Sequence, residues 1–213
     1  MTRVPSVKLL TSIALACFFL LIGALVLLHV LRPENDPRTR HLSEYVAGPY
    51  GYLMTVAFLA ACLGLAALAA ASWRAVERSI WIRLACLGLV AAAAANALMA
   101  AFAADSTVPD AAGHLLSSPV GVLHERIANL HALVWAGTVV AVPLAVLADA
   151  RARRLFARSA GAGVLVLAAM GARALAPASW EGLAQRAWVS AVMVWCVSHA
   201  LAWRAQSQGA GLP

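Results

Sequence analysis

Residues 31–53, LRPENDPRTRHLSEYVAGPYGYL, form a polar segment between two long apolar runs. Within this segment, Asp36 followed by Pro37 favours the start of a turn, so a shaped loop is expected. The flanking runs, residues 9–31 and 50–72, each reach the length of roughly 20 residues that a helix needs to cross a bilayer. The segment therefore predicts two membrane-spanning helices joined by a structured polar loop.

The whole chain continues this alternation of apolar runs and polar connections. Hydrophobic residues make up 63% of the 213 residues and charged residues only 12%, whereas roughly a quarter of a soluble domain is charged. We therefore expect an all-α, polytopic membrane protein in which six transmembrane helices form one domain over residues 1–213. The expected spans are residues 7–31, 50–72, 82–104, 127–148, 160–176 and 187–203.

Lysine and arginine are distributed unevenly between the two sides of such a bundle. Most of the 16 basic residues fall on the side that holds both termini. Because basic residues gather on the cytoplasmic side of membrane proteins, we expect both termini in the cytoplasm. The basic residues on this side are Arg3, Lys8, Arg74, Arg78, Arg83, Arg151, Arg153, Arg154, Arg158 and Arg204.

The acidic residues and most histidines concentrate on the opposite, extracytoplasmic side. Titratable side chains supply most binding and catalytic groups, so a site is expected at this face. The net charge of +7 does not indicate nucleic acid, because the basic residues are spread along connections and form no single patch.

The first polar loop is one candidate wall of that site. Asp36, Arg40, Ser43, Glu44 and Tyr45 lie within it, and a guanidinium can bind a phosphate head group through two parallel hydrogen bonds. The alternative is a solvated loop whose charges pair with each other. The sequence leaves both interpretations open.

The start of the fourth span, HERIANLH, is a second candidate. His124 and His131 share a helix face, but their backbones are about 10 Å apart along the axis, so they cannot ligate one metal ion together. A metal site would need loop residues beside His124, with Asp105 and His114 as candidates. Such a site would support metal-assisted hydrolysis of a lipid, with Asp105 as ligand or base.

His131 lies about one turn inside the fourth span, where an ionisable residue indicates function by default. The alternative is a neutral imidazole that bonds another helix through Asn96 or a backbone carbonyl. A single haem held by His29 and either His131 or His124 is a third interpretation, which would make the protein an electron carrier.

Short motifs recur in the three polar stretches of this face. The first stretch contains D-P, S-x-Y and G-x-x-G, the second F-x-x-D and G-x-x-H, and the third G-L-x-x-R. In these motifs and their spacing the chain resembles, over nearly its whole length, the bacterial and archaeal membrane family called "domain of unknown function 998". The motif residues are Asp36, Pro37, Ser43, Tyr45, Gly48, Gly51, Phe102, Asp105, Gly121, His124, Gly182, Leu183 and Arg186.

The resemblance implies six membrane helices in a cell membrane, of the bacterial inner-membrane type, with polar motifs on the outer face. It implies no activity. The chain departs from the family pattern at Ala103, where a proline is usual, and at Asn129 and His131, where apolar residues are expected.

Together these observations predict an integral membrane protein with an outer polar site for a small ligand or lipid head group. Its alternatives are a metal-assisted lipid hydrolase, a single-haem electron carrier and an accessory subunit of a membrane complex. Membrane lipids are the expected partners, while the cofactor, any enzymatic activity and any homo-oligomer stay open. The expected ligand-binding residues are Asp36, Arg40, Ser43, Glu44, Tyr45, Asp105, His124, His131, Glu181 and Arg186.

Overall fold

The computed structural model describes residues 6–105 and 118–209, and every regular element within them is helical. This confirms the predicted all-α fold. The long helices are α1 (Val7–Leu31), α2 (Tyr52–Ala75), α3 (Ile80–Ala101), α4 (Pro119–Ala148), α5 (Phe156–Ala174) and α6 (Glu181–Gly209). Short 3₁₀ helices in the connections are η1 (Leu42–Val46), η2 (Arg153–Leu155) and η3 (Ala178–Trp180).

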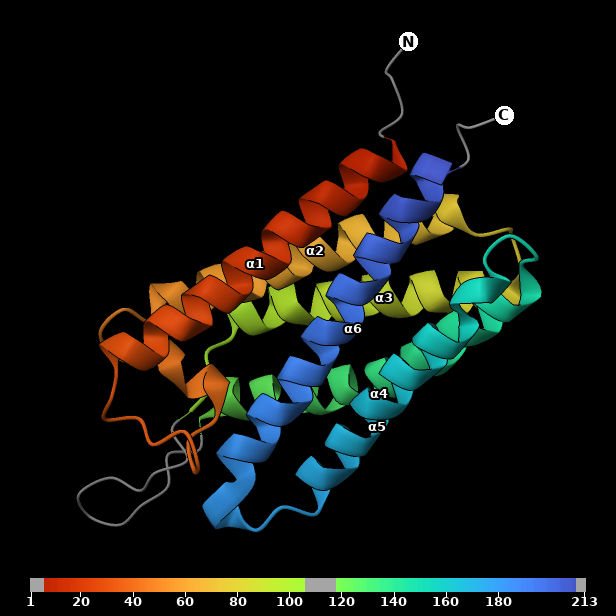
Figure 1. The fold of residues 1–213 in the computed structure, drawn as a ribbon. Helices are drawn as coiled ribbons and strands as arrows, with labels where there is room; N and C mark the ends of the chain where they lie inside the picture. The colour runs from red at the N-terminus through yellow and green to blue at the C-terminus, as the bar shows by residue number, and fades with distance from the viewer. Residues whose placement is uncertain (1–5, 106–117, 210–213) are drawn as a thin grey trace.

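The six long helices run up and down in a bundle (Figure 1). Each packs against the next along the chain, and α6 also packs against α1 and α2, which closes the bundle. Both ends of the chain lie at one end of it (Figure 1). Residues 32–51, 102–105 and 175–180 lie at the opposite end, which we call the loop end.

Five of these helices, α1 to α5, are long and apolar enough to cross a membrane. The sixth, α6, is as long but less apolar, because Ser190, Ser198 and His199 lie among its valines and alanines. It nevertheless runs between the same two ends of the bundle as its neighbours (Figure 1). The chain is therefore a multi-pass membrane protein.

Local capping decides where several helices begin. The Ser118 hydroxyl accepts a hydrogen bond from the Gly121 N–H at 2.9 Å, and Pro119 occupies the first turn of α4. Serine caps and early prolines both favour a helix start. For this reason α4 begins eight residues before the expected fourth span, and its first two turns carry polar side chains.

Close helix contacts inside the bundle use small residues. Ala71, Ala85 and Ala92 are fully buried, whereas Leu63 and Leu133 are 61% and 70% exposed. In a bilayer the large apolar side chains can face lipid, and small residues let helix backbones approach closely. Side-chain size thus separates the faces that meet lipid from those that meet other helices.

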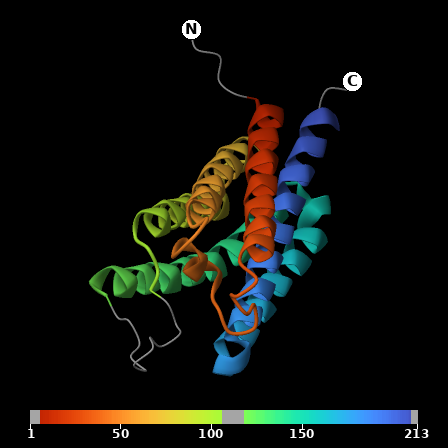
Figure 2. The same ribbon diagram turned by 90° about the vertical axis from the view of Figure 1, so that its left-hand side faces the viewer.

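At the loop end the bundle is divided between two groups of helices. In Figure 2, α3 and α4 lie on one side of α1, and α5 and α6 lie on the other, with the first polar loop, drawn in orange, between them. This loop therefore covers the centre of the bundle from the loop end.

The position of the termini gives a test of membrane topology. Because both termini lie at one end (Figure 1), a topology reporter fused to either terminus must give the same side of the membrane. The excess of Lys and Arg on that side predicts the cytoplasm. Reporters that place the two termini on opposite sides would contradict the fold, and two extracytoplasmic signals would contradict the orientation.

Candidate functional site

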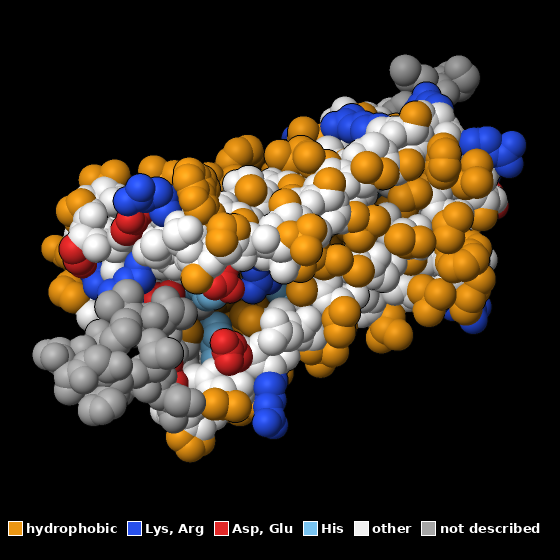
Figure 3. Space-filling view, turned by 90° about the horizontal axis from the view of Figure 1, so that it is seen from below, with side chains coloured by type: hydrophobic (Ala, Val, Ile, Leu, Met, Phe, Trp, Pro, Cys, Tyr) orange, Lys and Arg blue, Asp and Glu red, His pale blue; other side chains and the backbone are white. Residues whose placement is uncertain are grey.

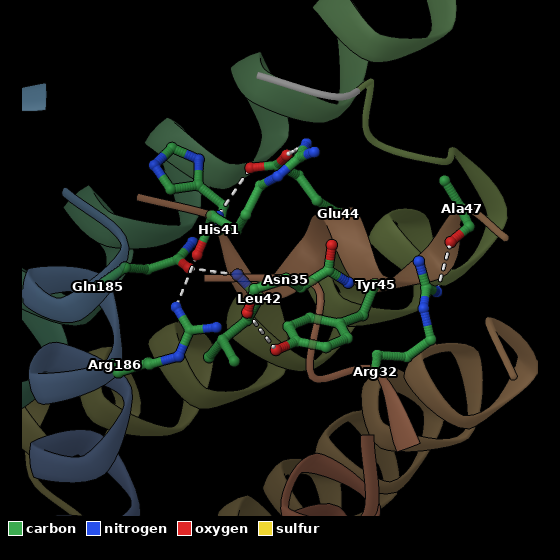
Figure 4. Close-up of polar contacts among 10 residues, drawn as sticks. Arg32, Asn35, His41, Leu42, Glu44, Tyr45, Ala47, Gln185 and Arg186 are labelled. Carbon is green, nitrogen blue, oxygen red and sulfur yellow. Dashed lines mark hydrogen bonds and ion pairs between the residues drawn. The ribbon is translucent and has the colours of Figure 1, made fainter. Parts of the chain in front are cut away.

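The first polar loop is held by hydrogen bonds within itself and by others to Gln185 and Arg186 of α6 (Figure 4). Glu44 is 6% exposed. Its carboxylate accepts a hydrogen bond from the His41 backbone N–H at 2.7 Å and forms an ion pair with Arg40 at 2.9 Å. A buried carboxylate needs such partners, so these contacts fix the start of η1.

Asp36 pairs with Arg38 within the same loop. Its carboxylate lies 2.9 Å from both the Arg38 backbone nitrogen and the Arg38 guanidinium. The hydrogen bond from the Arg38 side chain, followed by the one from its backbone, holds the pKa of Asp36 below its ordinary value. The pair therefore persists at neutral pH, and its support for the turn is lost only as the pH falls through that lowered pKa.

Arg32, the residue after α1, forms hydrogen bonds with the last part of the loop, just before α2. Its Nη1 donates to the carbonyls of Ala47 and Pro49 at 2.8 and 3.0 Å. Gly48, between them, has a φ of +84°, a left-handed conformation that residues with a side chain disfavour. This explains the first glycine of the G-x-x-G motif.

Arg186 of α6 connects three parts of the molecule. Its Nη1 donates to the carbonyls of Pro37 and Arg40 at 3.0 and 2.6 Å, and its Nε donates to His29 Nε2 of α1 at 2.9 Å. The guanidinium also lies 5.9 Å from the centre of the Tyr45 ring, a cation–π contact. We call these five residues the loop clasp.

The first turn of α6 lies directly on the backbone of the loop. A Cβ added at Gly182 would lie 2.5 Å from the Arg40 carbonyl oxygen, so only glycine permits this approach. The Leu42 N–H donates to Gln185 Oε1 at 2.7 Å (Figure 4). The third polar stretch is therefore in direct contact with the first.

The second polar stretch is tied to the start of α4. Asp105 accepts hydrogen bonds from the Ser118 N–H and hydroxyl at 2.6 and 2.8 Å. One turn into α4, His124 is 4% exposed, and its Nδ1 lies 2.7 Å from the Phe102 carbonyl oxygen. A carbonyl only accepts, so Nδ1 carries the proton.

A cavity of about 110 Å³ lies inside the bundle beneath the first loop. All six long helices and η1 contribute to its mostly apolar lining, and it has room for several water molecules or one small polar group. Charged and histidine side chains gather around a hollow at the loop end in Figure 3. The lining also includes side chains with hydroxyl, amide, imidazole or guanidinium groups. These are Ser43, Asn96, His124, His131, Arg173 and Gln185.

His131 is bonded to its neighbours as a neutral imidazole. Its Nε2 lies 3.0 Å from the Trp135 indole nitrogen and 3.2 Å from the Asn96 amide nitrogen. An indole N–H can only donate, so Nε2 is an acceptor. The alternative interpretation from the sequence, a bond to Asn96 on another helix, is confirmed.

Arg173, near the end of α5, is the one Lys or Arg among the described residues of the cavity lining. Its guanidinium lies 5.3 Å from the centre of the Trp188 ring and makes no hydrogen bond or ion pair with another described residue. Glu181 attracts it from a distance. The indole nitrogen of Trp188 is buried and has no hydrogen-bond partner among the described residues. The Trp188 indole and the Arg173 guanidinium are thus donors in the cavity lining that lack an acceptor within residues 6–105 and 118–209.

The structure distributes the ten expected site residues over three places. Ser43, His124 and His131 line the cavity, and Asp105 fastens the start of α4. The remaining residues build the loop and its contacts with α6, where Glu181 lies 3.3 Å from His41. This last group comprises Asp36, Arg40, Glu44, Tyr45, Glu181 and Arg186.

Sequence reasoning placed Arg173, Gln185 and Trp188 in no site. Arg173 carried a signal, because it is an ionisable residue within the expected fifth span, residues 160–176. Gln185 lies inside the G-L-x-x-R motif. Trp188 carried no signal that separates it from the other tryptophans.

The candidate metal ligands do not converge among the described residues. Within residues 6–105 and 118–209, no group of three His, Cys, Asp or Glu side chains is placed to hold a metal ion, while His114 lies outside the described residues. A haem ligated by His29 fits poorly, since its Nδ1 contacts the Leu25 carbonyl at 2.7 Å and its Nε2 accepts from Arg186.

The fold and the loop clasp define a multi-pass membrane protein whose polar loops close over an internal cavity. The family model described as "Protein of unknown function (DUF998)" matches residues 14–202. The chain therefore belongs to this family, as the motifs predicted. Comparisons with curated proteins and with solved structures gave no match.

The loop clasp predicts a specific cost for a conservative change. Replacing Arg186 with Lys keeps the charge, but one ammonium cannot serve both loop carbonyls and His29 in the same planar geometry. We expect a loss of about 2 kcal/mol in the free energy of unfolding, measured by thermal unfolding in detergent.

The matched control is Arg38→Lys, because its exposed ion pair with Asp36 contributes less than about 1 kcal/mol. Equal stability of the Arg186→Lys variant and the wild type would show that the clasp does not hold the loop end together.

Proposed function

We propose that this integral membrane protein binds the anionic head group of a small amphiphilic ligand, such as a membrane lipid, in the cavity at its loop end. The observation that carries the proposal is the guanidinium of Arg173, which borders the cavity without a hydrogen bond to any described residue. Guanidinium binds phosphate and carboxylate groups through paired, charge-assisted hydrogen bonds.

The charge of the cavity lining supports an anionic ligand. Among the described residues, the lining contains the cation Arg173 and no carboxylate. Gln185 and Trp188 add amide and indole N–H groups, and N–H donors complement the oxygens of a head group. A positively charged ligand would find no counter-ion in this lining.

The remaining lining supports an amphiphile. Met54, Phe58, Leu65 and Met99 surround the polar groups, and binding pockets commonly combine an apolar wall with a few convergent polar groups. Hydrolysis assisted by a metal is less well supported, because no three His, Cys, Asp or Glu side chains among the described residues are placed to hold a metal ion.

The loops at this end fit a supporting role. Arg32, Arg38 and Arg40 each form an ion pair with an acidic residue of the same loop. These charges therefore stabilise the loop that covers the cavity. On the predicted orientation, this cover faces the extracytoplasmic side.

Substitution of Arg173 tests the proposal. We expect Arg173→Gln to reduce the phosphatidylglycerol that remains bound after purification by at least tenfold, because it removes a charge-assisted interaction of about 1.5–3 kcal/mol. Bound lipid is measured by native mass spectrometry and by phosphate analysis after extraction.

The control is Arg38→Gln, which removes the same charge from an exposed ion pair at the same end of the protein. Its bound lipid should equal that of the wild type. Equal retention by wild type and Arg173→Gln would overturn the proposed function.

A further inference from the structure

A second hollow opens between α1 and α6 on the outside of the bundle. It has a volume of about 680 Å³ and is lined mainly by apolar side chains. The two helices lie close together at the termini and diverge towards the loop end (Figure 1). At the terminal end Arg204 bonds Ser12 at 3.2 Å, and at the loop end Arg186 bonds His29 at 2.9 Å. Between these contacts α1 and α6 leave a groove.

The groove and the internal cavity share a wall. The same five side chains line both hollows, so these side chains lie between the two. Leucine, valine and methionine side chains change rotamer without breaking a hydrogen bond, and methionine is especially adaptable. The shared side chains are Leu21, Leu25, Leu42, Val189 and Met193.

We infer that the ligand is a lipid that enters sideways from the bilayer, with its head group in the cavity and a hydrocarbon chain in the groove between α1 and α6. This inference rests on the proposed function. As in the proposed function, Arg173 in the cavity attracts an anionic head group. The groove presents a mainly apolar surface to the hydrocarbon chain.

The size of the groove favours this occupant. Its volume lies in the range of small-molecule pockets, about 300–1,000 Å³, whereas a partner helix is about 10–12 Å across and needs a long open face. The Arg186 to His29 contact limits the groove at the loop end. A chain that lies in it must therefore leave towards the bilayer, between the helices.

Substitutions in the groove alone can test the entrance without filling the cavity. Val26 of α1 and Ser190 of α6 line the groove but not the cavity, and both are exposed. The double variant Val26→Trp/Ser190→Trp should narrow the groove from both sides. The matched control is Leu27→Trp/Ala187→Trp, because these exposed neighbours line neither hollow.

The full chain is purified with bound phosphatidylglycerol and mixed with detergent micelles that contain the deuterated lipid. Native mass spectrometry then follows the replacement of the bound lipid. We expect the groove variant to exchange lipid about tenfold more slowly than the wild type, or to retain less of it, and the control to match the wild type. Equal thermal unfolding of the two variants shows that the groove variant is folded.

The outcomes separate the two proposals. Loss of lipid in Arg173→Gln together with unchanged exchange in the groove variant would refute the lateral entrance and leave the proposed function standing. Unchanged retention in Arg173→Gln would refute the proposed function itself.

A second measurement uses the wild-type chain. Phosphatidylglycerol with a photoreactive diazirine at the end of one chain should label groove residues of α1 or α6. Labelling spread evenly over the outer faces of the bundle would contradict the inference.

Discussion

The guanidinium of Arg186 is the interaction on which the loop end depends. It satisfies carbonyls at Pro37 and Arg40 and binds His29, so it joins α6, the first loop and α1 at one point. Irregular backbone near a membrane must have its polar groups satisfied by protein or water. Without this side chain the loop would lose its fixed place over the bundle, and the cavity beneath it would lose its cover.

The two arginines of the loop end, Arg186 and Arg173, differ in the number of hydrogen bonds they make to described residues. Arg186 donates to carbonyls and to a histidine, which accounts for its place in a structural contact. Arg173 stacks on Trp188 but makes no hydrogen bond to another described residue. This half-buried guanidinium has no acceptor among the described residues, and the proposed anionic ligand would supply one.

Much of the fold could be predicted from the sequence, because the apolar runs are long and polar connections separate them clearly. The bond between Asn96 and His131 was also foreseeable, since a polar group within a membrane helix needs a partner. Which arginines pair with other residues and which line the cavity could not be predicted. Composition and spacing place Arg173, Arg186 and the loop arginines at the same face, and only the packing of α6 onto the first loop shows which are paired.

The cavity itself escaped prediction for a related reason. Ser43, His124 and Gln185 come from three stretches of the chain that lie far apart in sequence. Their meeting depends on the close approach of Gly182 to the Arg40 carbonyl and on the early start of α4 at Pro119. A motif marks such residues without showing which of them face inward.

An experimental structure of the protein in nanodiscs containing phosphatidylglycerol tests the central claim most directly. We expect head-group density within hydrogen-bond distance of the Arg173 guanidinium, with a hydrocarbon chain continuing between α1 and α6. A cavity that holds only water or protein side chains, with Arg173 turned out to the membrane surface, would contradict it.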